Sequence, residues 1–413
     1  MQYSVRPTAP TRPCEAPHAA LPPIRMFTPS ALLAVFATVP DPRSRYGVRF
    51  ALSAILALAV AAILSNHLSV LAIAQWGAMQ HPDLLQTLGF PDGVTPHQST
   101  LQRLFRKLDP DSLSAALTRY FATMPTVAST GERPRGSQGV AIDGKAQRGR
   151  LTFAAAGCPV HALSAFLHEH GIVLAHEPID YDEQTDKAEA ELTVAPALLA
   201  RVDWHGRVLT GDALFCQRAL CQQVLDAGGD YLLIVKENQP TLHEDIRLLF
   251  APPVGSLPLD DRREAQTIDH GHGRHNDRRH LVASTDLVGY SDWPGLAQVF
   301  RLARTWQEHG LTKGEVRYGI TSLPPTIAEA ARLLALKRGH WQIENQLHYV
   351  KDVTLGEDRS LVHLGHGASV LALVRDLALS LLRQSGCRTI ASRLRFHSCH
   401  PEHAVAMIAS PPG

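Results

Sequence analysis

The sequence predicts an α/β protein in which an all-α N-terminal domain precedes a mixed sheet with a β-rich insertion. Three observations carry this prediction. Residues 27–125 contain apolar segments at helical spacing. From residue 139 onward, short apolar strands alternate with helices. Polar, proline-containing and strand-like pieces at about 238–325 then interrupt this alternation, which indicates an insertion.

Length and composition limit the classes of function. The 413 residues suffice for two or three domains with a sizeable core. A net charge of +1 excludes an overall basic field, so any contact with nucleic acid must come from local basic clusters. The six cysteines are scattered without a CxxC pair. That pattern disfavours a zinc knuckle or a disulfide framework and fits a reducing compartment.

The N-terminal segment 1–26 has the proline- and alanine-rich composition of a disordered tail, and both Met1 and Met26 are candidate starts. It lacks the apolar stretch of a secretory signal. The apolar segment 50–64 is about 15 residues long, short of the roughly 20 residues that cross a bilayer. We interpret it as a buried helix, with a membrane span as the alternative.

The segment 99–108 predicts a short amphipathic helix, with Ser99 as its N-cap. Its outer face carries Arg103, Arg106 and Lys107. Two interpretations stay open. The helix reads DNA after a preceding helix and turn, or it is an ordinary solvated amphipathic helix.

After a linker at 126–138, the region 139–385 begins with the order β-β-β-α-β-α-β. Three strands with hairpin-like links followed by α/β crossovers are typical of a ribonuclease H-like domain, although other mixed sheets share this order. Residues 326–351 predict a long helix, and residues 386–413 are expected to be a C-terminal tail.

Two aspartates follow short apolar strands of this region. Asp143 precedes Gly144 after the first strand, and Asp212 follows Gly211 after the fourth. Each Asp-Gly pair alone predicts only a turn. Carboxylates at strand ends, however, face the crevice where ligands bind in open α/β sheets. Since the expected fold makes the two strands neighbours, the pair predicts a divalent-ion site, which suits oxygen ligands.

A third carboxylate, Glu344, lies in the predicted helix 326–351. The spacing i, i+4, i+8 and i+11 predicts one helix face for His340, Glu344, His348 and Lys351. Three carboxylates suit two-metal phosphoryl chemistry, with ions about 4 Å apart. We expect His348 to orient water or contact DNA, and Lys351 to neutralise a phosphate. Alternatively, Glu344 and His348 bind zinc, which needs a further nitrogen or sulfur ligand.

Six ordered stretches resemble a known family. They are Pro40-Asp41-Pro42-Arg43, Ala141-Ile142-Asp143-Gly144-Lys145, Leu209-Thr210-Gly211-Asp212-Ala213, Lys236-Glu237-Asn238-Gln239-Pro240-Thr241-Leu242, Gly271-His272-Gly273-Arg274 and Arg338-Gly339-His340-Trp341-Gln342-Ile343-Glu344-Asn345. From about residue 36 to residue 382 the chain resembles the ISAs-type insertion-sequence transposases of the DDE superfamily, the group that includes the H-repeat-associated proteins.

The resemblance implies a ribonuclease H-like catalytic domain in which Asp143, Asp212 and Glu344 form the metal-binding and catalytic triad, with Mg²⁺ as cofactor and Mn²⁺ as a substitute. It implies a helical domain that binds the element's terminal inverted repeats, and cleavage of DNA strands followed by their transfer to target DNA. By analogy we expect a homodimer on DNA, in the cytoplasm at the bacterial nucleoid and away from membranes.

Further candidate DNA contacts lie near the predicted site. They are Lys145, Arg148, Lys236 and Asn238. Exposed loop residues, or a structural role for the last two, are the alternatives. Lys337 and His340 stand where the family carries tyrosine and arginine, and residues 187–191 lack the polar pair usual before the family's glutamate. We expect Trp341 to pack beside the helix, with stacking on a flipped base as the alternative.

Two other functions compete with a transposase. A domesticated protein would bind DNA without cutting it, and a repair-type or ribonuclease H-like nuclease would cut without joining. The intact set of three acids disfavours the first. The helical N-terminal region and the long insertion disfavour the second.

Overall fold

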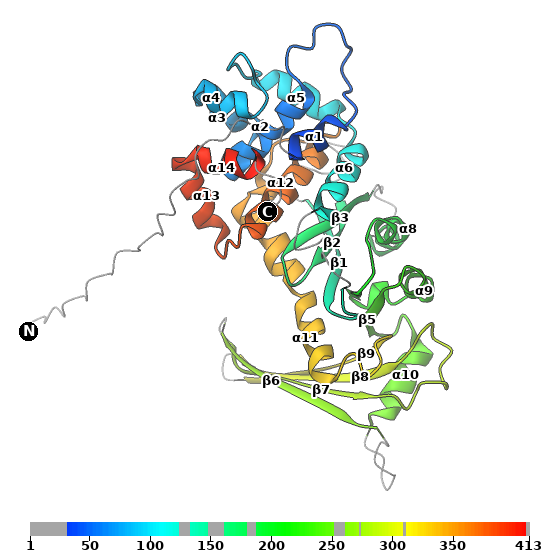
Figure 1. The fold of residues 1–413 in the computed structure, drawn as a ribbon. Coiled ribbons are helices and arrows are strands. Elements are labelled where there is room, and N and C mark those ends of the chain that lie inside the picture. The colour runs from blue at the N-terminus through cyan, green and yellow to red at the C-terminus, as the bar shows by residue number, and fades with distance from the viewer. Residues whose placement is uncertain are drawn as a thin grey trace, which may run out of the picture.

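The computed structural model describes residues 31–123, 133–147, 161–179, 187–251, 261–271, 274–308 and 311–409. The predicted N-terminal tail, most of the predicted linker and Arg148 therefore lie outside the described residues. Within them the chain is a mixed α/β protein with a helical N-terminal region (Figure 1), as the sequence predicted.

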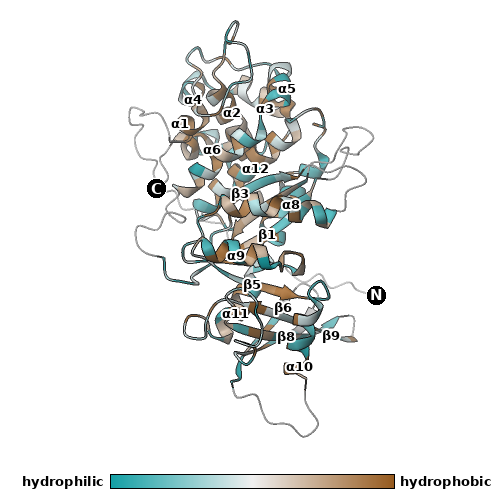
Figure 2. Ribbon diagram, turned by 90° about the vertical axis from the view of Figure 1, so that its right-hand side faces the viewer, coloured by the Kyte–Doolittle hydropathy of each residue, from teal (hydrophilic) through white to brown (hydrophobic). Residues whose placement is uncertain are grey.

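The N-terminal region is a run of short helices. They are α1 (Ala31–Ala37), α2 (Leu52–Leu64), α3 (Val70–Met79), α4 (Pro82–Thr87), α5 (Gln98–Lys107) and α6 (Pro110–Ala122). Apolar α2, brown in Figure 2, is buried along almost its whole length, which confirms the prediction of a buried helix. No helix in the described part of the chain is long and apolar enough to cross a membrane.

The N-cap of α5 differs from the prediction. His97, rather than Ser99, caps the helix, because its ring Nδ1 accepts the backbone N–H of Ser99 at 3.3 Å. The helix therefore begins at Gln98, before the predicted start. The basic face is unchanged, and Arg103, Arg106 and Lys107 are all exposed.

One sheet of nine strands runs through the rest of the described chain, in the order β3-β2-β1-β4-β5-β9-β8-β7-β6. The strands are β1 (Gln138–Ala146), β2 (His161–Leu167), β3 (Ile172–Ile179), β4 (Arg207–Gly211), β5 (Asp230–Val235), β6 (Arg263–Gly271), β7 (Arg274–Ser284), β8 (Gln298–Glu308) and β9 (Leu311–Thr321). β1, β2 and β3 pair antiparallel, and β4 and β5 continue parallel to β1. The strand-rich insertion does not form a separate sheet, since β9 pairs with β5.

Helices cover both sides of this sheet. α8 (Lys187–Ala200) and α9 (Arg218–Asp226) lie on one side of β1–β5, and α11 (Ala330–His340) runs along the other and continues over β6–β9 (Figure 1). α10 (Pro240–Leu249) contacts β8 and β9. α12 (Gly367–Gln384) packs against α2 and β3, so the helical region and the first strands share one hydrophobic core. A second core lies between α11 and the insertion strands.

The structure corrects two predictions beyond α11. The long helix predicted for 326–351 ends as an α-helix at His340 and continues as the π-helical segments η2 (Ile343–His348) and η3 (Val350–Thr354), before the short turn η4 (Glu357–Arg359). The expected C-terminal tail instead contains α13 (Ile390–Cys399) and α14 (Pro401–Ala409), which contact α2. In α13 the apolar residues are interleaved with arginine and histidine, which hid the helical spacing, and α14 is only nine residues long.

Candidate active site

The two aspartates occupy equivalent positions on neighbouring strands. β1 and β4 are parallel, with Ala141 opposite Thr210, and Asp143 and Asp212 each lie two residues further along. Adjacent strands are about 4.8 Å apart, so both carboxylates are at the same edge of the sheet. The sequence-based expectation that these strands are neighbours is confirmed.

Asp212 begins a tight turn that the following strand supports. Its carboxylate accepts the backbone N–H of Leu214 at 2.9 Å, at the start of η1 (Ala213–Phe215). After β5, the Asn238 amide donates to the Ala213 carbonyl at 2.7 Å. Asn238 therefore has a structural role in this structure, whereas Lys236 is exposed at the same end of the sheet.

A close approach between α11 and β1 places the helix that leads to Glu344. The His168 ring lies against both Gly139 on β1 and Gly339 on α11, where a Cβ on either glycine would overlap it. Its Nε2 is 2.9 Å from the Thr210 hydroxyl, which is also 3.4 Å from Nδ1 of His340. Burial lowers the pKa of His168 to about 3, so the ring is neutral. These contacts fix α11 on the two strands that carry the aspartates.

The π-helical turns decide which side chains meet beyond α11. Bonding from i to i+5 widens each turn, so the prediction of one face for His340, Glu344, His348 and Lys351 is wrong. His340 faces Thr210, and Lys351 is buried elsewhere. Glu344 and His348 remain together, with 3.1 Å between Glu344 Oε2 and His348 Nδ1.

Asp143, Glu344 and His348 form a compact cluster. His348 Nδ1 is also 3.6 Å from Asp143 Oδ2, and one ligand atom from each of the three side chains lies within 4.8 Å of the others. The carboxylate of Asp212 is outside this group and faces its own turn. The structure thus brings two of the three predicted acids together with a histidine that was expected to contact DNA or orient water.

Other acidic side chains surround Asp143 and help to raise its pKa. Burial raises the pKa of Asp143 to about 6; His348 opposes the shift, and neighbouring carboxylates add to it: Glu191, Asp212 and Glu344. The hydrogen bond from His348 lowers the pKa of Glu344. A carboxyl group held among other acids in this way is typical of a site that binds a cation.

Glu191 on α8 is a site residue whose position the sequence did not predict. It is buried and lies 3.1 Å from His161 and 3.3 Å from Lys187. A Cβ at Gly144 would overlap its carboxylate, so Glu191 packs against the residue next to Asp143. The sequence noted this glutamate only through a departure from the family at 187–191, and the packing of α8 on the sheet places it.

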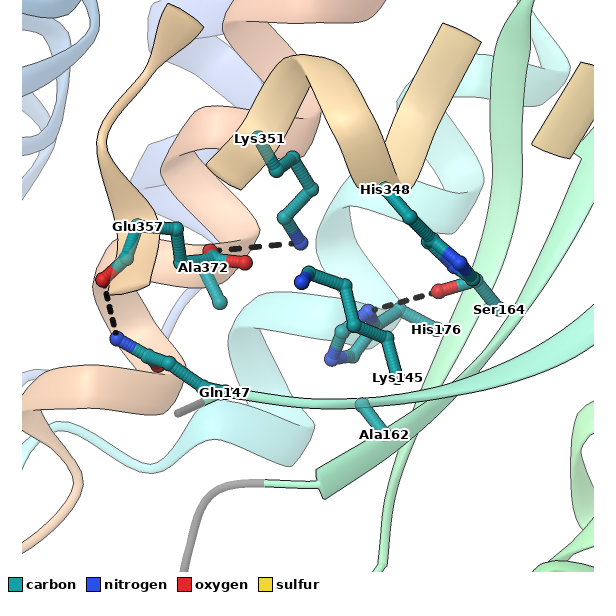
Figure 3. Close-up of a pocket in the computed structure, with 9 residues that line it drawn as sticks. All are labelled: Lys145, Gln147, Ala162, Ser164, His176, His348, Lys351, Glu357 and Ala372. Carbon is teal, nitrogen blue, oxygen red and sulfur yellow. Dashed lines mark hydrogen bonds and ion pairs between the residues drawn. The ribbon is translucent and has the colours of Figure 1, made fainter. Parts of the chain in front are cut away.

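Two predicted DNA-contact lysines are already paired with acids. Lys145 lies 2.5 Å from Asp352. Lys351 is 3% exposed and lies 2.7 Å from Asp376 and 3.5 Å from Glu357. Figure 3 shows Lys145 and Lys351 around a small cavity, with the Lys351–Glu357 pair dashed. Lys351 therefore does not present its ammonium to a phosphate in this structure, which contradicts its predicted role.

A groove of about 1300 Å³ extends from Glu344 over the insertion strands. Its arginines are paired with acids, as in Arg279–Asp277 and Arg338–Asp269. Trp341 was expected to be packed but is 51% exposed along this groove. The spacing of the helix did not reveal this, because the groove is formed by strands distant in sequence.

Lys337, at the position of the family's tyrosine, is buried at the same groove. Burial and the charge of Arg317 lower the pKa of Lys337 to about 8, while Asp212 raises it. Lys337 therefore lies within electrostatic reach of the second aspartate, which links α11 to both halves of the candidate site.

Comparisons with known proteins identify the family of the chain. The family model described as "Transposase DDE domain" matches residues 134–381, and the model described as "DDE_Tnp_1-associated" matches residues 33–121. The relative "Putative transposase YncI" of Escherichia coli is 28% identical over 91% of this chain and 94% of its own length. "H repeat-associated putative transposase YhhI" of the same species is 28% identical over 83% of this chain and 88% of its own length.

A relative from Xanthobacter autotrophicus, "Uncharacterized protein in dhlA 3'region", is 31% identical over 70% of this chain and 92% of its own length. Among solved structures, a piggyBac transposase synaptic complex with hairpin DNA covers 92% of this chain and 77% of that chain, at 11% identity and a TM-score of 0.37. That likeness is too weak to establish a shared fold. The family model spans more than half of the sequence, and the chain therefore belongs to the transposase family defined by the DDE domain.

Proposed function

We propose that this chain is an insertion-sequence transposase that cleaves DNA strands at terminal inverted repeats and transfers them to target DNA, using Asp143, Asp212 and Glu344. One observation carries the proposal. Two aspartates stand at equivalent positions of adjacent parallel strands, and a helix docked on those strands brings a glutamate to the first of them.

The donor set fits divalent cations such as Mg²⁺ or Mn²⁺. Carboxylate oxygens are the ligands that Mg²⁺ prefers, and the raised pKa of Asp143 reflects negative charge that a cation would neutralise. When bound, two such ions activate a water or a 3′-hydroxyl and stabilise the leaving oxygen. Zinc is a weaker fit, because the three-residue cluster offers a single nitrogen donor.

Residues around the triad position its members or provide a path for DNA. His168 and Thr210 hold α11, and hence Glu344, at the edge of the sheet. Lys337 is buried on α11 and adds positive charge that partly offsets the charge of Asp212, which in turn opposes the lowering of the Lys337 pKa by burial. The groove that begins at Glu344 provides a path for a strand, with exposed Trp341 available for contact with a base.

A ribonuclease H-like architecture is part of this proposal. The order β3-β2-β1-β4-β5, with three antiparallel strands and two parallel additions, supports it. In this architecture α10 and β6–β9 form the insertion between the second aspartate and the glutamate. We place the domain borders at 27–125 for the helical domain and at 139–385 for the catalytic domain.

The helical domain supplies recognition of the terminal repeats in this proposal. The exposed side chains of Arg103, Arg106 and Lys107 on α5 support it, since exposed basic residues on one helix bind phosphates or base edges. Exposed Lys236 extends the basic surface near the catalytic edge. The chain acts as a homodimer on DNA, because both ends of an element must be cut. It does so in the cytoplasm, at the nucleoid.

The experiment incubates labelled terminal-repeat DNA with the full chain and Mg²⁺, as wild type and as Asp212→Ala. Nicking by the wild type followed by strand transfer, both lost in the variant, is the expected result. Binding without cutting would identify a DNA-binding protein without catalysis. Cutting of any duplex or hybrid without joining would identify a nuclease, and either result would overturn the proposal.

A further inference from the structure

His348 occupies a place that the predicted roles leave unexplained. Its side chain is 5% exposed, so it cannot serve as a DNA contact on the protein surface. Its Nδ1 points between two carboxylates, 3.1 Å from Glu344 Oε2 and 3.6 Å from Asp143 Oδ2. An imidazole nitrogen at this position lies among the atoms that are expected to hold a cation.

We propose that His348 is a metal ligand, which binds through Nδ1 the ion held by Asp143 and Glu344. This inference rests on the proposed function, because it concerns the ion of that reaction. The π-helical turn places Glu344 and His348 side by side, and β1 brings Asp143 to both. The resulting site is a mixed one, with one nitrogen and two carboxylate ligands.

The second ring nitrogen of His348, Nε2, is placed as expected for a ring that binds an ion through Nδ1. Nε2 of His348 has no hydrogen-bond partner among the residues that the structure describes. His348 also lines a small cavity of about 10 Å³ together with Ser164, His176 and Lys145 (Figure 3). That volume accommodates about one water molecule among polar groups. A ligating histidine normally donates its second ring N–H to such a partner.

Metal binding by Nδ1 sets the tautomer of His348. The hydrogen bond to Glu344 in the metal-free chain uses a proton on Nδ1. Binding requires that nitrogen's lone pair, so the neutral ring carries its proton on Nε2 in place of Nδ1, and the Nε2 N–H donates into the cavity. The alternative is that His348 keeps its hydrogen bond to Glu344 when the ion is bound, and then no nitrogen binds the ion.

The choice of metal ion follows from the nitrogen ligand. Mg²⁺ favours oxygen ligands, whereas imidazole favours transition metals. We therefore expect the chain to bind Mn²⁺ more tightly than Mg²⁺. Replacement of the imidazole by an amide, in His348→Gln, should reduce this preference.

The test uses Mn²⁺ bound to the full chain and electron spin-echo envelope modulation, which detects nitrogen bonded directly to Mn²⁺. We expect ¹⁴N modulation in the wild type, and its replacement by a ¹⁵N pattern after labelling with ¹⁵N-histidine. His348→Gln should lose the modulation and bind Mn²⁺ at least about tenfold more weakly. His340→Gln, a buried histidine near the cluster but outside it, should retain the modulation.

Asp143→Asn identifies the site, since it should weaken Mn²⁺ binding. Absence of Mn²⁺ binding, or Asp143-dependent binding without nitrogen modulation in the wild type, would overturn the proposal. The wild-type measurement does not depend on whether any variant folds. DNA cleavage measured in parallel separates the two proposals. If the chain cleaves DNA but shows no nitrogen modulation, the proposal that His348 is a ligand is wrong and the proposed function stands. If it shows nitrogen modulation but does not cleave DNA, the proposed transposase function is wrong.

Discussion

At the scale of single residues, the site is defined by where charged groups are buried. Asp143 lies among three other carboxylates at the sheet edge, and burial raises its pKa to about 6. Its charge therefore costs stability until a cation is bound. This is the usual situation of a functional acid whose environment suits a ligand more than it suits folding.

The raised pKa predicts a pH-dependent gain in stability for Asp143→Asn in metal-free buffer. The folded chain binds this proton more tightly than the unfolded chain, so ionised Asp143 destabilises the fold above pH 6, and the cost disappears below about pH 4. We expect the variant to gain on the order of 1 kcal/mol at pH 7.5, after allowance for solvent screening. Thermal unfolding at pH 7.5 and pH 4 measures the difference.

The matched control is Asp226→Asn, at an exposed position on α9, which should change the melting temperature little at either pH. A wild type that is more stable than Asp143→Asn at pH 7.5 would contradict this interpretation of Asp143. Addition of Mn²⁺ should make the wild type more stable than Asp143→Asn, because only the wild type has all of the metal ligands.

At the scale of elements, the segment that carries Glu344 is anchored from two sides. α11 is docked on β1 through His168, and η3 is fixed to α12 by the buried pair Lys351–Asp376. Asp376 also lies 3.2 Å from His176 on β3. The π-helical turns between these anchors place Glu344 at the sheet edge. The buried Lys351–Asp376 pair therefore positions the segment that carries Glu344 and does not contact DNA.

Lys351→Met should destabilise the fold by about 3–5 kcal/mol, because it leaves Asp376 buried without its closest cation. Urea unfolding measures the loss, and the double variant Lys351→Met/Asp376→Asn should recover part of it. Lys236→Met, at an exposed lysine, should stay within about 0.5 kcal/mol of the wild type. A Lys351→Met variant as stable as the wild type would show that the pair does not anchor η3.

At the scale of the whole molecule, the sequence predicted what depends on local patterns. Apolar runs ending at an aspartate predicted β1 and β4 as neighbours, although β1 continues past Asp143 to Ala146, and apolar spacing predicted α2 as a buried helix. The π-helical turns were not predictable, because Lys351 meets Asp376 and His340 meets Thr210 across long separations in sequence. The position of Glu191 and the pairing of β9 with β5 likewise depend on tertiary packing.

The two regions that match family models pack against each other. The chain matches the associated N-terminal model and then the DDE domain, and α12, which lies mostly within the DDE match, packs against α2 of the N-terminal match. In the proposed function, this packing holds a DNA end bound by the helical region in a fixed position relative to the sheet edge. The triad residues and the helical region would then act on one DNA substrate.

The central claim is that Asp143, Asp212 and Glu344 form one metal-dependent site for joining DNA strands. The most direct measurement supplies a terminal-repeat end that already carries a free 3′-hydroxyl, together with a supercoiled target plasmid and Mg²⁺ or Mn²⁺. We predict joining by the wild type and by Asp226→Asn. Asp143→Asn, Asp212→Asn and Glu344→Gln should each join at least about a hundredfold more slowly while still binding the DNA end. Joining at the wild-type rate by any of these three variants, or no joining by the wild type with either ion, would contradict the claim.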